Sequence, residues 1–194
     1  VAQGNIQGGM DRLMASLGNS LGKALPPVER WNPPFCGDID MRIARDGTWF
    51  YLGTPMGRMP MVRLFSSILK LENGKYYLVT PVEKVGIKVD DAPFVAVDFD
   101  VSGEGTAQMV TFTTHVGDTA TANADHRVRV ERDAVTGEPS PYVMIRAGLE
   151  ALIDRKSFYR LVDLAVHKVV DGESWFGLWS GGCFFPVIPS LELG

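Results

Sequence analysis

The sequence predicts an α+β fold in which two related sheet-plus-helix domains, with mostly antiparallel strands, follow a short N-terminal helix. The main observation is that three short segments recur later in the chain in the same order. The recurring pairs are MRIARD at 41–46 with VRVERD at 128–133, MVRLFSSIL at 61–69 with FYRLVDLAV at 158–166, and Asn73-Gly74 with Asp171-Gly172. Self-similarity in a fixed order indicates an internal duplication, so we expect the same structural unit twice.

The repeat divides the chain into three expected parts. An N-terminal helix and linker occupy residues 1–30, the first repeat domain occupies 31–95, and the second occupies 96–194. A chain of 194 residues is long enough for two small domains. Its hydrophobic fraction of 45% and charged fraction of 22% are those of a soluble globular protein, so neither a metal nor a disulfide is needed to hold the core.

Cysteine use and hydropathy bear on the compartment. Cys36 and Cys183 fall in different repeats and form no CxxC pair, so we expect reduced thiols in a cytoplasmic protein, with a bridge between the repeats as the alternative. No apolar run approaches the roughly 18 residues that a membrane-spanning helix needs, and we identify no signal peptide. The expectation is therefore a protein with no membrane association.

The charge balance limits the partners. Residues 1–97 carry eleven Lys and Arg against nine Asp and Glu, whereas residues 98–194 carry eight against fourteen. A protein that follows a nucleic-acid backbone needs clustered cations. The acidic second half therefore argues against nucleic acid, while a small anionic ligand at one local basic position remains compatible with the sequence.

The N-terminal helix is expected from apolar spacing. Its polar face lacks the run of Lys and Arg that a membrane-surface helix needs, so we expect it to pack on its own domain. Pro26-Pro27 stops it. The apolar residues at helical spacing are Met10, Leu13, Met14, Leu17 and Leu21.

The first repeat begins with two strands. Residues 31–40 are expected to be irregular, because Pro33-Pro34 forces an extended path. The alternation of apolar and polar residues from Met41 predicts a strand, and Asp46-Gly47 predicts a hairpin turn before the return strand TWFYLG.

A helix and two more strands complete the first repeat. The helix is expected to open at Arg58-Met59-Pro60, because Pro suits a first helical turn, and to end at Asn73-Gly74. Strands YYLVT and KVGIKV follow. The buried stripe of the helix is expected to comprise Met61, Leu64, Phe65, Ile68 and Leu69.

The second repeat follows a hairpin, FVAVDFDV and TAQMVTFTTH joined by SGEG, and a loop expected at 117–125. Its first strand starts at Arg127, and strand YVMIR comes after a longer turn. A helix is expected to begin near Asp154, which can cap it. Strands WFGLWS and CFFPV, joined by Gly181-Gly182, complete the repeat.

The segments DGTWFYLGTPMGR, KYYLVTPVEKV and VDDAPF resemble a bacterial family known only as a domain of unknown function, and the resemblance extends through LWSGGCFF. It implies a duplicated two-domain α+β fold whose second domain is superficially similar to pleckstrin homology domains. It also implies binding of a nucleotide-like ligand at the domain interface and a role in signal transduction. It supplies no catalytic residues.

Seven residues form the candidate ligand site. Arg58 precedes a helix, where its guanidinium and free N–H groups can hold an anion together. Thr80 and Ser180 end corresponding strands, and Trp179 can stack on a base. For the arginines, ion pairing or solvation is the alternative, and for the tryptophan, burial in a core. The full set is Arg58, Thr80, Glu83, Lys84, Arg146, Trp179 and Ser180.

No catalytic residue, metal site or cofactor is predicted. The histidines lack ligand spacing such as HxxxH. Asp38 and Asp40, spaced to share one side of a strand, are the only carboxylate pair considered for acid–base or metal chemistry. A pair that caps a turn is the alternative.

Three functions follow from these observations. The leading hypothesis is non-enzymatic binding of a small anionic, nucleotide-like ligand between the two domains. The second is a protein-interaction module that uses the second domain. The third is a metal-dependent hydrolase of a phosphorylated small molecule, acting through Asp38 and Asp40.

Overall fold

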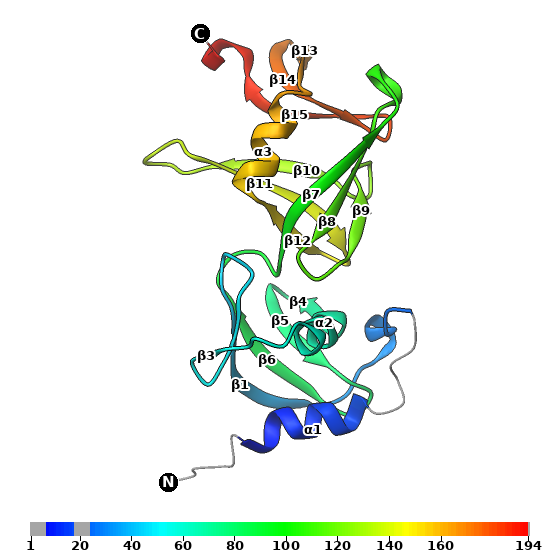
Figure 1. The fold of residues 1–194 in the computed structure, drawn as a ribbon, viewed down its shortest axis with the longest axis vertical. Helices are drawn as coiled ribbons and strands as arrows, with labels where there is room; N and C mark the ends of the chain where they lie inside the picture. The colour runs from blue at the N-terminus through cyan, green and yellow to red at the C-terminus, as the bar shows by residue number, and fades with distance from the viewer. Residues whose placement is uncertain (1–6, 18–23, 194) are drawn as a thin grey trace. The chain divides into compact units, whose positions relative to one another are not determined.

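The computed structural model describes residues 7–17 and 24–193. The chain forms two compact units, unit 1 (Val1–Asp91) and unit 2 (Ala92–Gly194), which are considered one at a time. Each contains a mostly antiparallel sheet with helices beside it, which confirms the α+β class (Figure 1). No helix among the described residues is long and apolar enough to cross a bilayer.

Unit 1 is built on one six-stranded sheet in the order β3-β2-β1-β6-β5-β4. The β1–β6 pair is parallel and the other neighbours are antiparallel. Its elements are α1 (Gln7–Leu17), a 3₁₀ turn η1 (Val28–Arg30), β1 (Phe35–Ile43), β2 (Trp49–Tyr51), β3 (Thr54–Pro55), α2 (Met59–Ser67), β4 (Leu69–Glu72), β5 (Lys75–Val79) and β6 (Lys84–Val89).

Both helices of unit 1 cover the same face of its sheet. Ile43 pairs with Trp49 across β1 and β2, and the Phe65 ring of α2 stacks on Trp49 at 6.4 Å. On the same side of β1, a Cβ built at Gly9 of α1 would lie 3.4 Å from Ile39. The predicted N-terminal helix therefore forms and packs on unit 1, with Leu13 fully buried, while Leu21 lies outside the described residues.

Unit 2 holds a six-stranded sheet, β10-β11-β12-β7-β8-β9, and a three-stranded sheet, β13-β14-β15. The β12–β7 pair is parallel. Its elements are β7 (Phe94–Ser102), η2 (Gly105–Ala107), β8 (Met109–Thr114), β9 (Thr119–Thr121), β10 (Val128–Arg132), β11 (Pro139–Arg146), β12 (Leu149–Ile153), α3 (Arg155–Val162), β13 (Val166–Val170), β14 (Glu173–Ser180), β15 (Cys183–Pro189) and η3 (Ser190–Leu193).

The two units share one order of elements. Three strands, a helix and three strands run from β1 to β6 and again from β10 to β15. The neighbours also correspond, because β10 lies beside β15 as β1 lies beside β6. Arg45 and Arg132, which the sequence repeat aligns, each pair with a carboxylate beyond the last strand, Asp91 at 3.1 Å and Glu192 at 2.6 Å.

Tight turns recur at matching places. Leu52-Gly53 joins β2 to β3 and Ala147-Gly148 joins β11 to β12, each with both φ angles positive. Asn73-Gly74 and Asp171-Gly172 do the same between β4 and β5 and between β13 and β14. Two-residue turns of this kind match the twist of antiparallel strands, so the Asn-Gly and Asp-Gly signals mark hairpins.

The predicted end of the first helix was wrong, and the strand that follows the second helix was not predicted. α2 ends at Ser67 and α3 at Val162, and a strand precedes each following turn: β4 starts at Leu69 and β13 at Val166. In unit 1, buried Leu69 continues the apolar spacing of the helix although it lies in β4. Helical periodicity alone therefore concealed both strands.

Two expected irregular segments contain strands, and the unit boundary differs from the expected one. β1 already begins at Phe35, with irregular register around Asp38, and β9 lies within the loop expected at 117–125. The division after Asp91, rather than after residue 95, follows from β7, which begins at Phe94 and pairs with β12 of unit 2.

Candidate functional site

Thr80 and Glu83 form the turn between β5 and β6. The Thr80 amide donates to the Glu83 carbonyl at 2.9 Å, and the Glu83 amide donates to Thr80 Oγ1 at 3.1 Å. Thr80 is fully buried, and the Glu83 carboxylate lies 3.8 Å from Arg12 Nε of α1. The bonds of both residues hold the turn and attach α1 to it.

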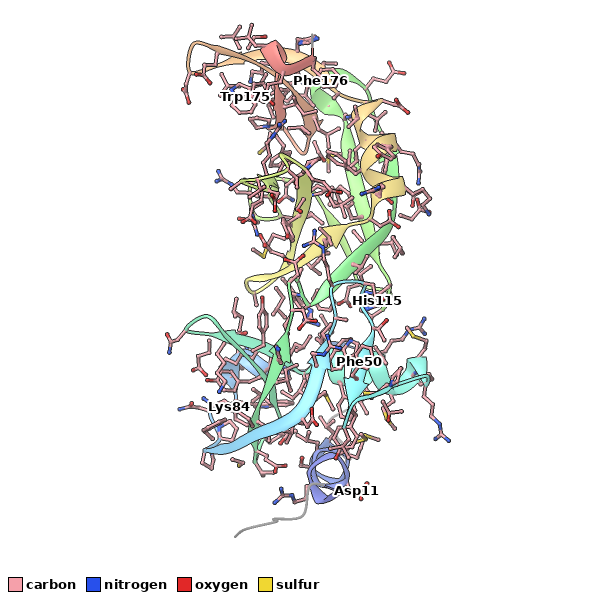
Figure 2. All side chains as sticks on the ribbon, turned by 90° about the vertical axis from the view of Figure 1, so that its left-hand side faces the viewer. Asp11, Phe50, Lys84, His115, Trp175 and Phe176 are labelled. Carbon is pink, nitrogen blue, oxygen red and sulfur yellow. The ribbon has the colours of Figure 1, made fainter. Side chains whose placement is uncertain are left out.

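Lys84 lies at the start of β6, on the sheet face opposite the helices (Figure 2). Its ammonium pairs with Glu72 at 2.9 Å and lies 4.9 Å from the centre of the Tyr77 ring. The hydrogen bond from Lys84 holds the pKa of Glu72 below its usual value. Lys84 is therefore engaged by partners from β4 and β5.

Ser180 connects two sheets of unit 2. Its hydroxyl accepts the Val110 amide of β8 at 2.8 Å and donates to the Ala122 carbonyl after β9 at 2.7 Å. The side chain is fully buried. Both hydrogen-bonding roles of the hydroxyl are used, so Ser180 stabilises the end of β14.

Trp179 is half-buried next to Ser180. Lys168 Nζ lies 4.4 Å from its ring centre, and the Phe184 ring packs edge-on at 5.5 Å. The Trp179 carbonyl accepts a hydrogen bond from Gln108 at 2.9 Å. Lys168 of β13 and Phe184 of β15 thus both pack against the Trp179 ring.

Arg146 is largely buried, with 19% of its side chain exposed. Its guanidinium lies 3.5 Å from Asp118 and 5.2 Å from the Phe94 ring centre. Burial lowers the Arg146 pKa, and the Asp118 charge partly opposes that shift. The residue ties the end of β11 to the β8–β9 turn, as a structural ion pair does.

Arg58 differs from the other six. It is exposed, and neither a hydrogen bond nor an ion pair of its side chain is found in the described part of the chain. It occupies the N-cap position of α2 without a capping bond. The Met61 and Val62 amides already donate to the Arg58 carbonyl, and Pro60 has no N–H. The helix terminus therefore adds little to an anion site, contrary to our expectation, and the guanidinium is the main donor.

Two adjoining pockets flank Arg58 and form an open groove between α1, the segment 54–58 and α2. Their volumes are ≈ 290 Å³ and ≈ 560 Å³, and both are lined by Gly57, Arg58 and Met61. Five of the eight methionines of the chain lie along them, and we call the combined site the methionine groove. Its other lining residues are Met10, Met14, Tyr51, Thr54, Pro55, Met56, Met59, Pro60 and Leu64.

The sequence reasoning found Arg58 but not the groove around it. Met10, Met14 and Met61 were assigned to helix packing, and Met56 and Met59 received no role. The available signal was the run MGRMPM at 56–61, in which an arginine lies among methionines. The remaining unit 1 candidates, Thr80, Glu83 and Lys84, do not line the groove.

The carboxylate pair considered for hydrolysis has a different environment from the one expected. Asp38 pairs with Lys75 at 2.8 Å, and this hydrogen bond raises the Lys75 pKa. A Cβ at Gly86 would lie 2.0 Å from Asp38 Oδ1, so the carboxylate lies against the glycine backbone. No cluster of three or more metal-ligating side chains is found in the described residues.

Comparison with known families identifies both halves of the chain. Residues 26–92 match the N-terminal domain of DUF1285, a domain of unknown function, and residues 93–187 match its C-terminal domain. A search of curated proteins gives no match.

Two crystal structures are similar to the chain. A DUF1285 family protein from Silicibacter pomeroyi DSS-3 shares 65% identity over 93% of this chain and 97% of that one, with a TM-score of 0.85. A second, from Shewanella baltica OS155, shares 30% identity over 63% of this chain and 90% of that one, with a TM-score of 0.50. The family resemblance inferred from the sequence is thereby confirmed, and the chain belongs to the DUF1285 family.

Proposed function

We propose that the protein is a non-enzymatic binding protein for a small anionic ligand, and that Arg58 in the methionine groove anchors the anion. The observation that carries this proposal is the exposed, unpaired environment of the Arg58 side chain among the described residues. Six of the seven candidate residues have structural partners, whereas the Arg58 guanidinium is exposed beside an open, mainly apolar groove. Ligand sites commonly combine apolar walls with a few polar groups that fix orientation.

The N-cap of α3 in unit 2 differs in charge from Arg58, the N-cap of α2, although the sequence repeat aligns Arg58 with Arg155. Asp154 caps α3, and its carboxylate accepts the Ser157 amide at 2.8 Å. Carboxylates are favoured at the positive end of a helix, whereas a cation there is unfavourable. The N-cap of α2 is thus a cation, which weakens its helix, whereas the N-cap of α3 is a carboxylate, which stabilises it, and a locally unfavourable residue is expected at functional positions. Arg155, which the repeat aligns with Arg58, pairs with Glu138 at 2.6 Å, whereas no such partner of Arg58 is found in the described part of the chain.

The proposed site lies within unit 1, whereas the sequence suggested a ligand between the domains. Nucleotides remain the first class to test, because the sequence-based hypothesis named them. A role in signalling would follow if occupancy of the groove changes what the protein binds.

The test is a thermal-shift and calorimetric screen of the full chain against mono-, di- and cyclic nucleotides and organic carboxylates. A ligand that binds the folded state raises its stability by RT ln(1 + [L]/Kd). The proposal predicts a dose-dependent rise for one class, with affinity at least tenfold weaker in Arg58→Gln.

Arg63→Gln is the matched control. Arg63 is an exposed arginine on the same helix and lies outside the methionine groove. Equal loss in both variants would point to diffuse electrostatics, and no shift with any anion at millimolar concentration would overturn the proposal.

A second candidate function, protein interaction through unit 2, is favoured by β13. It is the edge strand of the three-stranded sheet, with Val166 and Val169 exposed at 45% and 66%. Val170 and Glu173 flank the two-residue turn. Hydrogen-bonded pairs alternate from there, so the Val169 amide points away from β14. An extended peptide could add there as a fourth strand.

A photo-crosslinking residue at position 169, with position 135 as the control, tests this second candidate. Val135 is also exposed, but it lies in the β10–β11 turn. The candidate predicts one stoichiometric partner that crosslinks at 169 only and is lost in Val169→Pro, which removes the outward N–H. Crosslinking at both positions, or persistence in the proline variant, would argue against it.

A further inference from the structure

The walls of the methionine groove suit a flexible apolar chain. Met59 and Met14 are 39% and 38% exposed, so both side chains present apolar surface that a ligand can cover. Methionine has three rotatable bonds and a polarizable sulfur, so a surface rich in it adapts to irregular ligands. Of the described residues that line the groove, only Tyr51 is aromatic.

The charge of the groove suits one small anionic head. Among the described residues, Arg58 is the only ionisable one other than Tyr51 that lines either pocket. A guanidinium forms two parallel hydrogen bonds with a single carboxylate. A phosphate monoester carries about −1.5 to −2 charges near neutral pH, so a nucleotide would be better matched by a second cation, which the described lining residues do not include.

From these two features we propose that the ligand is a single-chain amphiphile, the carboxylate of an alkyl or acyl chain. This inference rests on the proposed function and specifies its ligand. The head binds Arg58, where the two pockets join. The chain extends along the larger pocket, over Met59 and Leu64 of α2 and Met14 of α1.

Calorimetry with the full chain and a series of octanoate, decanoate and dodecanoate, each below its micelle concentration, tests the proposal. Burial of each added methylene should tighten binding about two- to fourfold. Arg58→Gln should weaken every member at least tenfold, and Met59→Ser should reduce the gain per methylene. Arg63→Gln should bind as the wild type does.

Two probes separate the alternatives. Dodecyltrimethylammonium has the same tail and the opposite charge, so it should bind at least tenfold more weakly than dodecanoate. Equal binding would mean nonspecific adsorption and would overturn the inference. Vesicles with anionic lipids should not bind more tightly than monomeric dodecanoate; the reverse result would replace a free amphiphile with a membrane surface.

The same experiment distinguishes the two levels of the proposal. If a nucleotide binds through Arg58 and the carboxylates show no dependence on chain length, the amphiphile is wrong and the binding function stands. If no probe binds to a protein shown to be folded by circular dichroism, both are wrong. Binding of an acidic peptide, but of no alkyl carboxylate, would assign the groove to a protein partner.

Discussion

The two units use one arrangement of strands but close it differently. In unit 1, β1 and β6 form a parallel hydrogen-bonded pair that makes a single sheet. In unit 2, the matching strands β10 and β15 lie side by side but belong to separate sheets, and the additional strands β7, β8 and β9 extend the first sheet. The additional strands supply partners, such as the Val110 amide for Ser180, that fix side chains in unit 2. The described residues of unit 1 include no counterpart of these strands, and an open groove lies beside its helices.

The largest loss of stability should come from truncating a buried phenylalanine in the core of either unit. Phe65 of unit 1 and Phe112 of unit 2 are both fully buried, and each contacts a second aromatic ring. We expect Phe65→Ala and Phe112→Ala each to lower the free energy of unfolding of its own unit by about 3–5 kcal/mol. Hydrogen exchange resolved along the chain measures this. Equal loss of protection in both units from one substitution would show that the cores are not independent.

Replacing each N-cap residue with the residue type found at the other N-cap should give the next largest change in stability. Arg58→Asp should raise the stability of unit 1 by about 1 kcal/mol, while Asp154→Arg should lower that of unit 2 by about 1–2 kcal/mol. Urea denaturation followed by hydrogen exchange reports both changes. The stabilised Arg58→Asp variant should have lost ligand binding. If Arg58→Asp is instead destabilised, the guanidinium has a structural role and the contrast between the units fails.

A repeated arginine sharpens the comparison further. Arg160 of α3 pairs with Asp98 of β7 and lies 4.4 Å from the Phe99 ring centre, whereas Arg63 of α2 has no β7 equivalent to meet. Arg160→Gln should cost about 0.5–1 kcal/mol, and Arg63→Gln less than about 0.5 kcal/mol. Denaturation midpoints of the two variants measure the difference. Equal midpoints would mean that the β7 contacts add nothing.

The smallest effect should be the pH response of the first turns. Asp46 accepts the Thr48 amide, and the matching Asp133 accepts those of Val135 and Thr136; these bonds lower the pKa of both carboxyls. A lowered folded pKa gives stability that is present above the unfolded value of about 3.9 and is lost as pH falls below it. Stability should therefore decline below about pH 4, and the decline should be shallower in Asp133→Asn.

The sequence predicted those features that depend on local signals. The Asp154 cap, the Asn-Gly and Asp-Gly turns and the N-terminal helix all follow from neighbouring residues, and the repeat gave the fold class. Strands β4 and β13 were missed because each follows a helix whose apolar spacing it continues. The pairing of β12 with β7 was also beyond prediction, since it joins segments far apart in the chain.

The candidate site was harder to predict for a related reason. Whether a polar side chain has a partner depends on strands distant in the sequence: Ser180 is fixed by Val110 and Ala122, and Arg146 by Asp118. Arg58 could be distinguished from the other candidates only from the structure, which shows that the other six side chains have partners. The groove likewise joins Met10 and Met14 to residues more than forty positions later.

The Ser180 bridge also has a consequence for synthesis. Seventy residues separate it from Val110, and a ribosome adds about 5–20 residues per second. Ser180 is therefore synthesised roughly 4–14 s after Val110, and the hydrogen bond from the Val110 amide cannot form before then. All strands of unit 1 have been made before the first strand of unit 2. Unit 1 can fold during translation, whereas unit 2 closes only when β14 leaves the exit tunnel.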